Sequence, residues 1–419
     1  MDSRGLIAIF EFQLFWMQPL VSVLMITHNH APFIARSIQS VLSQESSFSV
    51  ELIIGHDAST DSTRDIIDRF ISLHPEKIKV VHHPQQIGMT QNFLHTLSRC
   101  EGKYIAILDG DDQWIDNKKL EIQVDFLEEN PHIIACGGNT ITRHTSGIRF
   151  FSLERVFKKW SNKNKLQLYD HEEMIVSNRL RSPTVVGRSE AFRIAAGSVT
   201  DGVVLDWPLY IGMAAGDQSG FFAVLPNLFA AYSVHQGGVF SGTSFSQRLE
   251  ISALARENIT SNSRGRYLGW HFPVCRLHDP VRYNQNLISE HYARHFSNAG
   301  ISFSIDDIPT AATILANSNK QLIEKFGFVF ALLSLKSKSF YEFTVKLGGI
   351  MQLLKNSSLP DQKKEKLLGC LGTAWRDTLF YSKPTFRILK PFILSSLRKY
   401  SGLSVLSVLH VCRHSYIKS

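Results

Sequence analysis

A short, almost entirely apolar run at residues 21–27, followed by a regular alternation of strand and helix patterns, constrains the fold of this chain most strongly. Such a run is typical of a strand that is buried on both faces of a parallel sheet. Further apolar runs at 50–55, 78–81 and 103–108 are separated by segments with helical periodicity. This spacing predicts a mostly parallel α/β sheet with right-handed connections, flanked by helices.

Polar side chains follow three of these predicted strands at the point where each strand ends. Thr27 and Asn29 come at the end of the first strand, Asp57 follows the second, and the sequence Asp109-Gly-Asp-Asp112 follows the fourth. In open α/β sheets, ligands bind beyond the carboxyl ends of the strands. We therefore expect these three polar clusters to converge on one edge of the sheet.

The sequence at 109–112 places three carboxylates within four residues. Such carboxylates repel one another unless a cation or a basic group compensates their charge. Mg²⁺ and Mn²⁺ commonly bind one or two carboxylates together with substrate phosphates. We therefore predict a Mg²⁺ or Mn²⁺ site here, which would neutralise a diphosphate leaving group. The alternative is a solvated acidic turn in which Asp112 caps the next helix.

The other polar and aromatic candidates each allow a structural alternative. Asp57 can accept a hydrogen bond from a uracil ring N–H or cap a turn, and Thr27 and Asn29 can satisfy backbone groups at strand ends. Trp114 and Trp207 can stack on an acceptor sugar ring or fill the hydrophobic core. The residues alone leave these choices open.

Four segments resemble glycosyltransferase family 2 in their order and spacing. They are residues 21–29, 56–62, 88–92 and 102–112. The resemblance covers roughly residues 19–240 and implies a GT-A type fold that binds a nucleotide-diphospho-sugar. It also implies transfer with inversion at the anomeric carbon.

The family resemblance assigns donor-binding roles to residues near the strand ends. The donor-binding set that it implies is Thr27, Asn29, Asp57, Gly88, Asn92, Asp109 and Asp111. Within this set, Asp57 would contact the base, which we expect to be uracil. Asp109 would lie near the ribose, and Asp111 would bind the metal.

The resemblance also implies catalytic roles further along the chain. Asp206 would be the general base that takes the proton of the acceptor hydroxyl, although an ordinary helix N-cap is an alternative. Asp201 and Asp217 are the competing carboxylates. His235 would lie near the metal or the diphosphate, and the two glycines that follow it suit a loop that folds over the donor.

The chain is expected to contain three parts. These are an N-terminal extension at 1–18 in which Met17 is a candidate start, a GT-A catalytic domain at 19–245, and a mainly helical, basic region at 246–419. Residues 320–419 hold 17 Lys+Arg and 5 Asp+Glu, whereas residues 1–319 hold 28 and 32. The basic, apolar end predicts peripheral contact with an anionic membrane, with a solvated helical face as the alternative. The acidic first part argues against nucleic-acid binding.

Cysteine usage indicates a reducing compartment. The five cysteines are scattered and form no CxxC pair, which argues against a disulfide framework and against a structural zinc site. No apolar run approaches the ~20 residues that span a bilayer. We therefore expect a cytoplasmic protein, with the inner face of the cytoplasmic membrane as its site of peripheral contact.

Taken together, these features predict an inverting, non-processive, metal-dependent hexosyltransferase. It would transfer a sugar from a nucleotide-diphosphate donor to a saccharide or lipid-linked acceptor in bacterial surface polysaccharide synthesis. A sugar-phosphate nucleotidyltransferase and a non-catalytic nucleotide-sugar-binding protein are the alternatives. The first needs a glycine-rich, basic loop after its first strand, which the sequence Thr27-His-Asn-His30 lacks, and the second has no need of three acidic strand ends. A dinucleotide-binding dehydrogenase is excluded because the GxGxxG motif is missing.

Overall fold

The computed structural model describes most of the first 262 residues and isolated positions further along the chain. The described residues are 19–144, 165–197, 199, 206–214, 220–239, 242–262, 271, 275, 279, 281, 282, 287, 360, 361, 364, 365, 368 and 369. They divide into two compact units, the first ending at Ser244 and the second consisting of 175–177 and the residues from Phe245 onward. The predicted extension at 1–18 and nearly all of the predicted basic segment lie outside the described residues.

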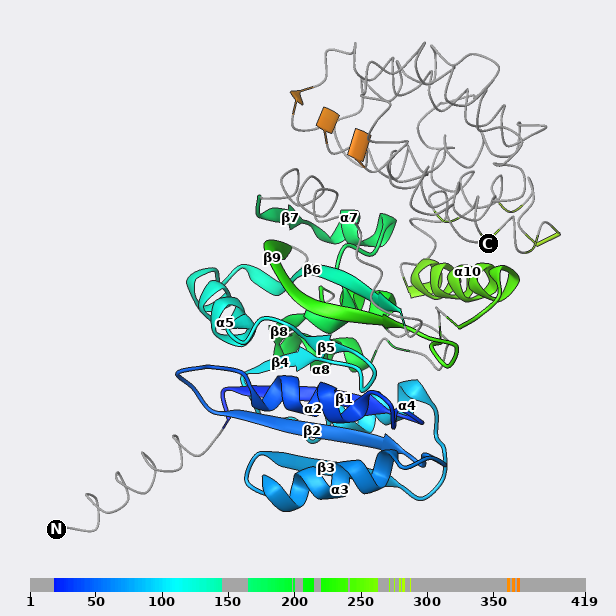
Figure 1. Cartoon of the computed structure of the whole chain (residues 1–419). Helices are drawn as coiled ribbons and strands as arrows, with labels where there is room; N and C mark the ends of the chain where they lie inside the picture. The colour runs from blue at the N-terminus through cyan, green and yellow to red at the C-terminus, as the bar shows by residue number, and fades with distance from the viewer. Residues whose placement is uncertain are drawn as a thin grey trace, which may run out of the picture. The chain divides into compact units, whose positions relative to one another are not determined.

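The predicted parallel sheet forms the first part of the fold (Figure 1). Its strands are β1 (Val21–Thr27), β2 (Val50–Asp57), β3 (Ile78–His83) and β4 (Tyr104–Ile107). They lie in the order β3-β2-β1-β4 and are all parallel. The helices between them are α2 (Ile34–Leu42), α3 (Thr63–Leu73) and α4 (Met89–Leu97). The predicted alternation of strands and helices is confirmed.

Helices cover both faces of this parallel part of the sheet. On one face, Val21 and Met25 of β1 pack with residues of α2, α3 and α5 (Lys119–Glu129). On the other face, Leu24 belongs to a core cluster that includes Phe93 of α4. Because successive side chains of a strand point to opposite faces, a strand covered on both sides must be apolar at almost every position.

The carboxyl ends of β1, β2 and β4 lie at the same edge of the sheet. Thr27 at the end of β1 pairs with His56 near the end of β2. Beyond β4, the backbone N–H of Gly110 donates to the carbonyl of Ile26 at 3.0 Å, so residues 109–112 run beside the end of β1. We call residues 109–112 the acidic loop. The predicted convergence of the polar strand ends follows from this register.

Strands after the acidic loop extend the sheet with mixed pairings. They are β5 (Gln113–Trp114), β6 (Ile133–His144), β7 (Gln167–Tyr169), β8 (Val186–Arg188) and β9 (Phe221–Val234). Strand β8 is antiparallel to both β4 and β6, β6 is parallel to β9, and β5 and β7 are antiparallel to β9. The nine-stranded sheet is therefore parallel in its first half and mixed in its second.

Strand β9 runs continuously through a proline, whereas the sequence predicts two strands at 221–225 and 228–234. Pro226 has no N–H to donate to a neighbouring strand. The partner strand β6 shifts its register between Gly137 and Asn139, and the side-chain amide of Asn139 donates to the carbonyl of Pro226 at 2.8 Å. This irregularity lets one strand continue to the acidic loop.

Two further helices pack against the second face of the sheet. They are α8 (Ser189–Ala196) and α9 (Asp206–Met213), and their buried residues Phe192 and Tyr210 join the same core cluster. The short helix α7 (His171–Val176) and the 3₁₀ turn η1 (Ser182–Thr184) precede them. Helix α9, as described, begins with Asp206.

The described part of the second unit consists of α10 (Phe245–Asn262) and isolated positions after it. The thiol of Cys275 lies 3.9 Å from the carbonyl of Ala253 in α10, and Arg282 forms an ion pair with Glu257 at 3.0 Å. In the part of the chain that the structure describes, no helix is long and apolar enough to cross a membrane.

Candidate active site

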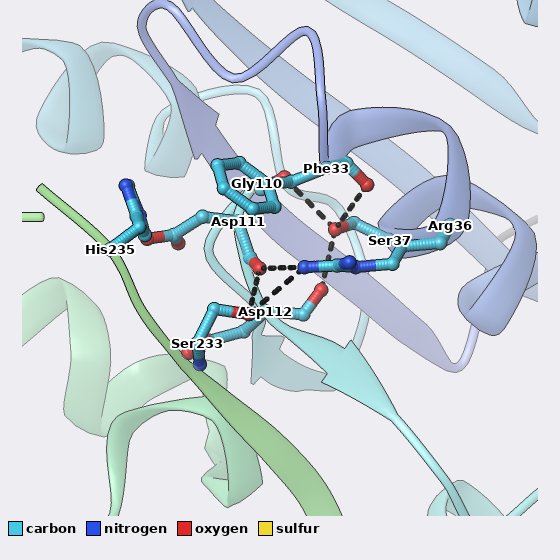
Figure 2. Close-up of polar contacts among 8 residues, drawn as sticks. All are labelled: Phe33, Arg36, Ser37, Gly110, Asp111, Asp112, Ser233 and His235. Atoms are coloured by element: carbon cyan, nitrogen blue, oxygen red, sulfur yellow. Dashed lines mark hydrogen bonds and ion pairs between the residues drawn. The ribbon is translucent and has the colours of Figure 1, made fainter. Parts of the chain in front are cut away.

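Backbone contacts hold the acidic loop between β1 and α2. The hydroxyl of Ser37 in α2 donates to the carbonyl of Gly110 at 2.9 Å and to that of Asp112 at 2.5 Å (Figure 2). A Cβ atom at Gly110 would lie 2.7 Å from the hydroxyl oxygen of Thr27 and 3.0 Å from Nδ1 of His30. A glycine is therefore needed here, because the loop backbone approaches these two side chains too closely for any other residue.

Asp111 and His235 form the centre of the site. Oδ2 of Asp111 lies 2.9 Å from Nε2 of His235, and both side chains are largely buried, with 16% and 8% of their surface exposed. Figure 2 shows the two residues approaching from the acidic loop and from the end of β9. Burial raises the pKa of Asp111, but the hydrogen bond to His235 and the nearby imidazoles outweigh it, so the pKa lies below its ordinary value.

Asp112 joins the acidic loop to β9. Its Oδ1 accepts the backbone N–H of Ser233 at 2.7 Å, and its Oδ2 is buried without a hydrogen-bond partner. The guanidinium of Arg36 strengthens the same connection by donating to the hydroxyl of Ser233 at 3.1 Å (Figure 2). Burial, with the charges of Asp111 and Asp109, raises the pKa of Asp112 well above its ordinary value. Asp112 thus links the acidic loop to β9, and it does not cap the following helix α5.

The charge of Asp206 acts on Asp109 in the acidic loop. Burial raises the pKa of Asp109 to about 7, with further contributions from the charges of Asp111 and Asp206. Burial also raises the pKa of Asp206, although two hydrogen bonds oppose the shift. These bonds come from the side-chain amide of Asn178 at 3.0 Å and from the backbone N–H of Trp207 at 2.7 Å. The catalytic candidate from α9 and the acidic loop therefore belong to one site.

Tyr232 lies in the negative potential of the same cluster. Burial, followed by the charges of Asp112, Asp111, Asp109 and Asp206, raises the pKa of the Tyr232 phenol above its ordinary value. The phenol is therefore neutral at physiological pH and can donate a hydrogen bond to a carboxylate or to a substrate oxygen.

Asp57 holds the loop that precedes α4. Its two carboxylate oxygens accept the backbone N–H groups of Ile87 at 2.7 Å and of Gly88 at 3.0 Å. Gly88 has a φ of 86°, in the region that favours glycine. Asp57 is 3% exposed, so it serves as a turn anchor at the edge where the family resemblance places the base.

Thr27 and Asn29 occupy different positions at the end of β1. The Thr27 hydroxyl oxygen is buried without a hydrogen-bond partner and lies against the acidic loop. Asn29 is exposed, has a φ of 54°, and accepts the backbone N–H of Thr60 at 2.8 Å with its side-chain oxygen. Asn29 thus supports the loop after β2, while its exposure leaves it accessible to a ligand.

Asn92 is buried under this edge, in the first turns of α4. Its side-chain nitrogen donates to the carbonyl of Gly55 at 2.9 Å, and it is 1% exposed. A Cβ at Gly55 would lie 2.3 Å from the side-chain oxygen of Asn92 and 2.0 Å from the hydroxyl oxygen of Thr96. Asn92 therefore fixes α4 against β2.

The two tryptophans lie in the core, which corrects the expectation that they stack on an acceptor. Trp114 is 2% exposed, donates its indole N–H to Pro183 at 2.7 Å, and has the ammonium of Lys119 at 4.1 Å from its ring centre. Trp207 is 6% exposed and donates its indole N–H to the carbonyl of Met174 at 2.7 Å. Covered ring faces and satisfied N–H groups favour the core alternative for both.

The chemistry of this edge fits a divalent cation. Two ligands at right angles around one ion, each about 2.1 Å away, lie about 3 Å apart, which agrees with the 2.9 Å between Asp111 and His235. The carboxylates of Asp109, Asp111 and Asp112 also offer oxygens within 4.8 Å of one another. A cation would compensate the repulsion among these buried acids.

Residues 22–187 match the family model described as glycosyl transferase family 2. The match runs from β1 to β8 and contains Asp57 and the whole acidic loop. Residues 22–187 form a glycosyltransferase family 2 domain. The predicted family is confirmed, and Asp206 and His235 lie beyond the family 2 match but in the same compact unit.

The family 2 domain has relatives among bacterial proteins. An uncharacterised protein of Mycobacterium bovis is 28% identical over 221 residues, which are 52% of this chain and 60% of the relative. TuaG of Bacillus subtilis, named "Putative teichuronic acid biosynthesis glycosyltransferase", is 39% identical over 112 residues, 27% of this chain and 43% of TuaG. The chain thus spans about 60% of the length of the first of these relatives.

A solved structure is also similar at a low level. TarS 1–349 of S. aureus in complex with UDP-GlcNAc gives a TM-score of 0.45 at 16% identity, covering 88% of this chain and 91% of TarS 1–349. At this level the likeness adds nothing to the assignment of the family 2 domain.

Four residues that shape the candidate site carry no motif of their own in the sequence. They are His30, Arg36, Asn178 and Tyr232. His30 had one available signal, since it ends the polar run 27–30 that follows the first buried strand. The other three come from a helix face, a loop and a strand, and only the fold brings them to the site. The competing carboxylates Asp201 and Asp217 lie outside the described residues.

Proposed function

We propose that this chain is an inverting, metal-dependent glycosyltransferase that transfers single sugars from a nucleotide-diphosphate donor, with UDP as the favoured nucleotide, to an acceptor hydroxyl. The observation that carries the proposal is the meeting of the acidic loop with His235 and Asp206 at one sheet edge. The contact of Asp111 with His235 at 2.9 Å and the effect of the Asp206 charge on the pKa of Asp109 support it. The family 2 domain supports the same reaction class.

Asp57 is suited to recognise a uracil base. Each of its oxygens already accepts one backbone N–H, from Ile87 and Gly88. An ionised carboxylate offers about four lone-pair sites, so two of them stay available for a ring N–H. A uracil ring presents such a donor, whereas the corresponding ring nitrogen of cytosine is an acceptor. This contrast favours UDP over CDP.

Asp111 and His235 would hold the divalent cation, and Asp109 would face the ribose side of the donor. When bound, the cation supplies positive charge to the diphosphate that leaves the sugar. Asp112 and Arg36 keep the acidic loop in place by their contacts with Ser233. The loop is therefore pre-organised, which is the condition for strong electrostatic stabilisation of a leaving group.

Asp206 would accept the proton of the acceptor hydroxyl. As that proton moves to a carboxylate oxygen of Asp206, the acceptor oxygen bonds to the anomeric carbon while the bond from this carbon to the diphosphate oxygen breaks. Attack opposite the leaving group inverts the anomeric centre. The hydrogen bond from Asn178 orients Asp206, and its raised pKa makes it a better proton acceptor than an exposed carboxylate.

The acceptor class is proposed by likeness. TuaG is named for teichuronic acid biosynthesis, which favours an acceptor in bacterial surface polysaccharide synthesis. The basic, apolar sequence of residues 320–419 supports peripheral contact with the inner face of the cytoplasmic membrane, where a lipid-linked acceptor would lie.

A thermal-shift screen of nucleoside diphosphates tests the proposed donor. We expect UDP to raise the melting temperature of the full chain in the presence of Mn²⁺ and to have little effect in excess chelator, because the ion joins the diphosphate to the acidic loop. GDP, ADP and CDP are the comparison ligands. Stabilisation by another base would overturn the assignment of uracil, and no stabilisation by any nucleotide would contradict donor binding at this edge.

A further inference from the structure

A third potential metal ligand lies beside Asp111 and His235. His30, from the loop between β1 and α2, offers a ring nitrogen that lies within 4.8 Å of the ligand atoms of the other two residues. The rings of His30 and His235 meet edge to face, with centroids 6.1 Å apart and an interplanar angle of 87°. The three residues thus come from three separate segments and meet at one point.

The imidazole of His30 has an unused nitrogen. Its Nδ1 is buried without a hydrogen-bond partner. It also borders the acidic loop, because a Cβ at Gly110 would lie 3.0 Å from it. A buried nitrogen without a partner is destabilising, and in native structures such a group often marks a functional site or the place of an ion.

The position of His30 is fixed by its surroundings. Its backbone N–H donates to the hydroxyl of Thr63 at 2.9 Å, and its carbonyl accepts the N–H groups of Phe33 and Ile34, both at 2.8 Å. The Phe33 ring lies 6.4 Å from the ring of His30 and 4.5 Å from that of His235. Phe33 therefore packs beside both imidazoles and limits their rotation, so that little ordering remains to be done when an ion binds.

We propose that His30 is a third protein ligand of the divalent cation, so that two imidazoles and one carboxylate hold it. This inference rests on the proposed cation site and deepens it. The three ligand atoms, two nitrogens and one oxygen, all lie within 4.8 Å of one another. Opposite ligands of a six-coordinate ion lie about 4.3 Å apart, so small side-chain adjustments can bring all three atoms into range of one ion.

This ligand set determines which ion the site prefers. Carboxylate and water ligands suit Mg²⁺, whereas imidazole ligands favour transition ions. A site with Asp111 alone would accept Mg²⁺ readily, because Mg²⁺ is usually bound through one or two carboxylates and substrate phosphates. With His30 and His235 both bound, the site prefers Mn²⁺ over Mg²⁺. His30 therefore adds to the preference that His235 already gives the site.

Metal binding to the full chain, without nucleotide, tests the inference. Electron spin echo modulation of bound Mn²⁺ counts imidazole nitrogens, and equilibrium dialysis gives the affinities for Mn²⁺ and Mg²⁺. We expect two imidazoles in the wild-type chain and one in His30→Gln. We also expect His30→Gln to weaken Mn²⁺ binding at least about 10-fold while changing Mg²⁺ binding much less. His132→Gln, at an exposed histidine outside the ligand group, should leave both measurements unchanged.

The outcomes separate this inference from the proposed function. One imidazole in the wild-type chain, or two in His30→Gln, overturns the role of His30 and leaves Asp111 and His235 as the cation site. No bound Mn²⁺ in the wild-type chain, even with UDP present, overturns both this inference and metal dependence. The wild-type spectrum counts ligands without any substitution, so the test remains decisive if His30→Gln does not fold.

Discussion

Replacing Asp111 with asparagine is expected to lower both donor hydrolysis and sugar transfer by more than about 10³-fold while the fold stays intact. The substitution preserves the size of the side chain but removes the charge that would bind the cation. The contact with His235 at 2.9 Å can persist as a hydrogen bond to the amide, so the packing of β9 against the acidic loop is retained. Transfer rates with excess Mn²⁺ and the melting temperature together measure the effect.

The matched control is Asp125→Asn, an isosteric change at an exposed aspartate of α5. It removes one negative charge without touching the site, so activity should remain within about two-fold of wild type. Wild-type transfer by Asp111→Asn, or by the unmodified chain in excess chelator, would refute metal dependence. An unfolded Asp111→Asn variant would contradict the view that Asp111 serves the reaction and not the fold.

Replacing Asp206 with asparagine is expected to slow transfer by ~10²–10⁴-fold with little loss of donor affinity. Asparagine cannot take the proton of the acceptor hydroxyl. One of the two neighbouring contacts, with Asn178 or with the N–H of Trp207, can be kept, because the single side-chain oxygen of asparagine still accepts a hydrogen bond. Single-turnover transfer rates and UDP affinity in the presence of Mn²⁺ separate the chemical step from donor binding.

The same residue predicts how transfer depends on pH. Because burial raises the pKa of Asp206, its base form is lost at a higher pH than for an exposed aspartate when the solution is acidified. Transfer in the wild-type chain should therefore fall on the acid side through this raised pKa, and Asp206→Asn should remove that limb. A loss of less than ten-fold in Asp206→Asn would point to Asp201 or Asp217 as the base.

The first half of the fold could be predicted because its signals are local. Strands β1 and β4 are buried almost throughout and apolar at almost every position, and the connecting helices show their own period. The position of Thr27, Asp57 and the acidic loop at one edge then follows from parallel pairing alone. Both the strands and the position of their polar ends can be predicted without long-range contacts, from the rule that such strands lie side by side.

The second half could not be predicted in the same way because its elements depend on distant partners. Strand β6 contains Gly137 and Gly138, which weaken a strand pattern in the sequence. In the structure, a Cβ at Gly138 would lie 2.4 Å from the ring of Phe229, so the glycine serves a close approach between β6 and β9. The two-residue strand β5 and three-residue strand β7 are too short to show any periodicity.

The candidate site likewise contains residues that the sequence predicts and residues whose roles depend on distant contacts. The carboxylates of the acidic loop stand out in the sequence, but the distinct role of Asp112 emerges only through its bond to Ser233 in β9. Trp114 and Trp207 lie next to proposed site residues along the chain, yet their side chains point into the core. His30 differs from the two tryptophans, because the fold brings its imidazole into the site, next to Asp111 and His235.

The most direct test of the central claim measures whether one ion contacts both the protein and the diphosphate. Pulsed electron paramagnetic resonance of Mn²⁺ with the full chain and UDP reports nitrogen couplings from imidazole and phosphorus couplings from the nucleotide. We expect both couplings on the same ion in the wild-type chain, and loss of the protein-bound ion in Asp111→Asn. Phosphorus couplings without imidazole nitrogen, as in free Mn²⁺–UDP, would contradict the account.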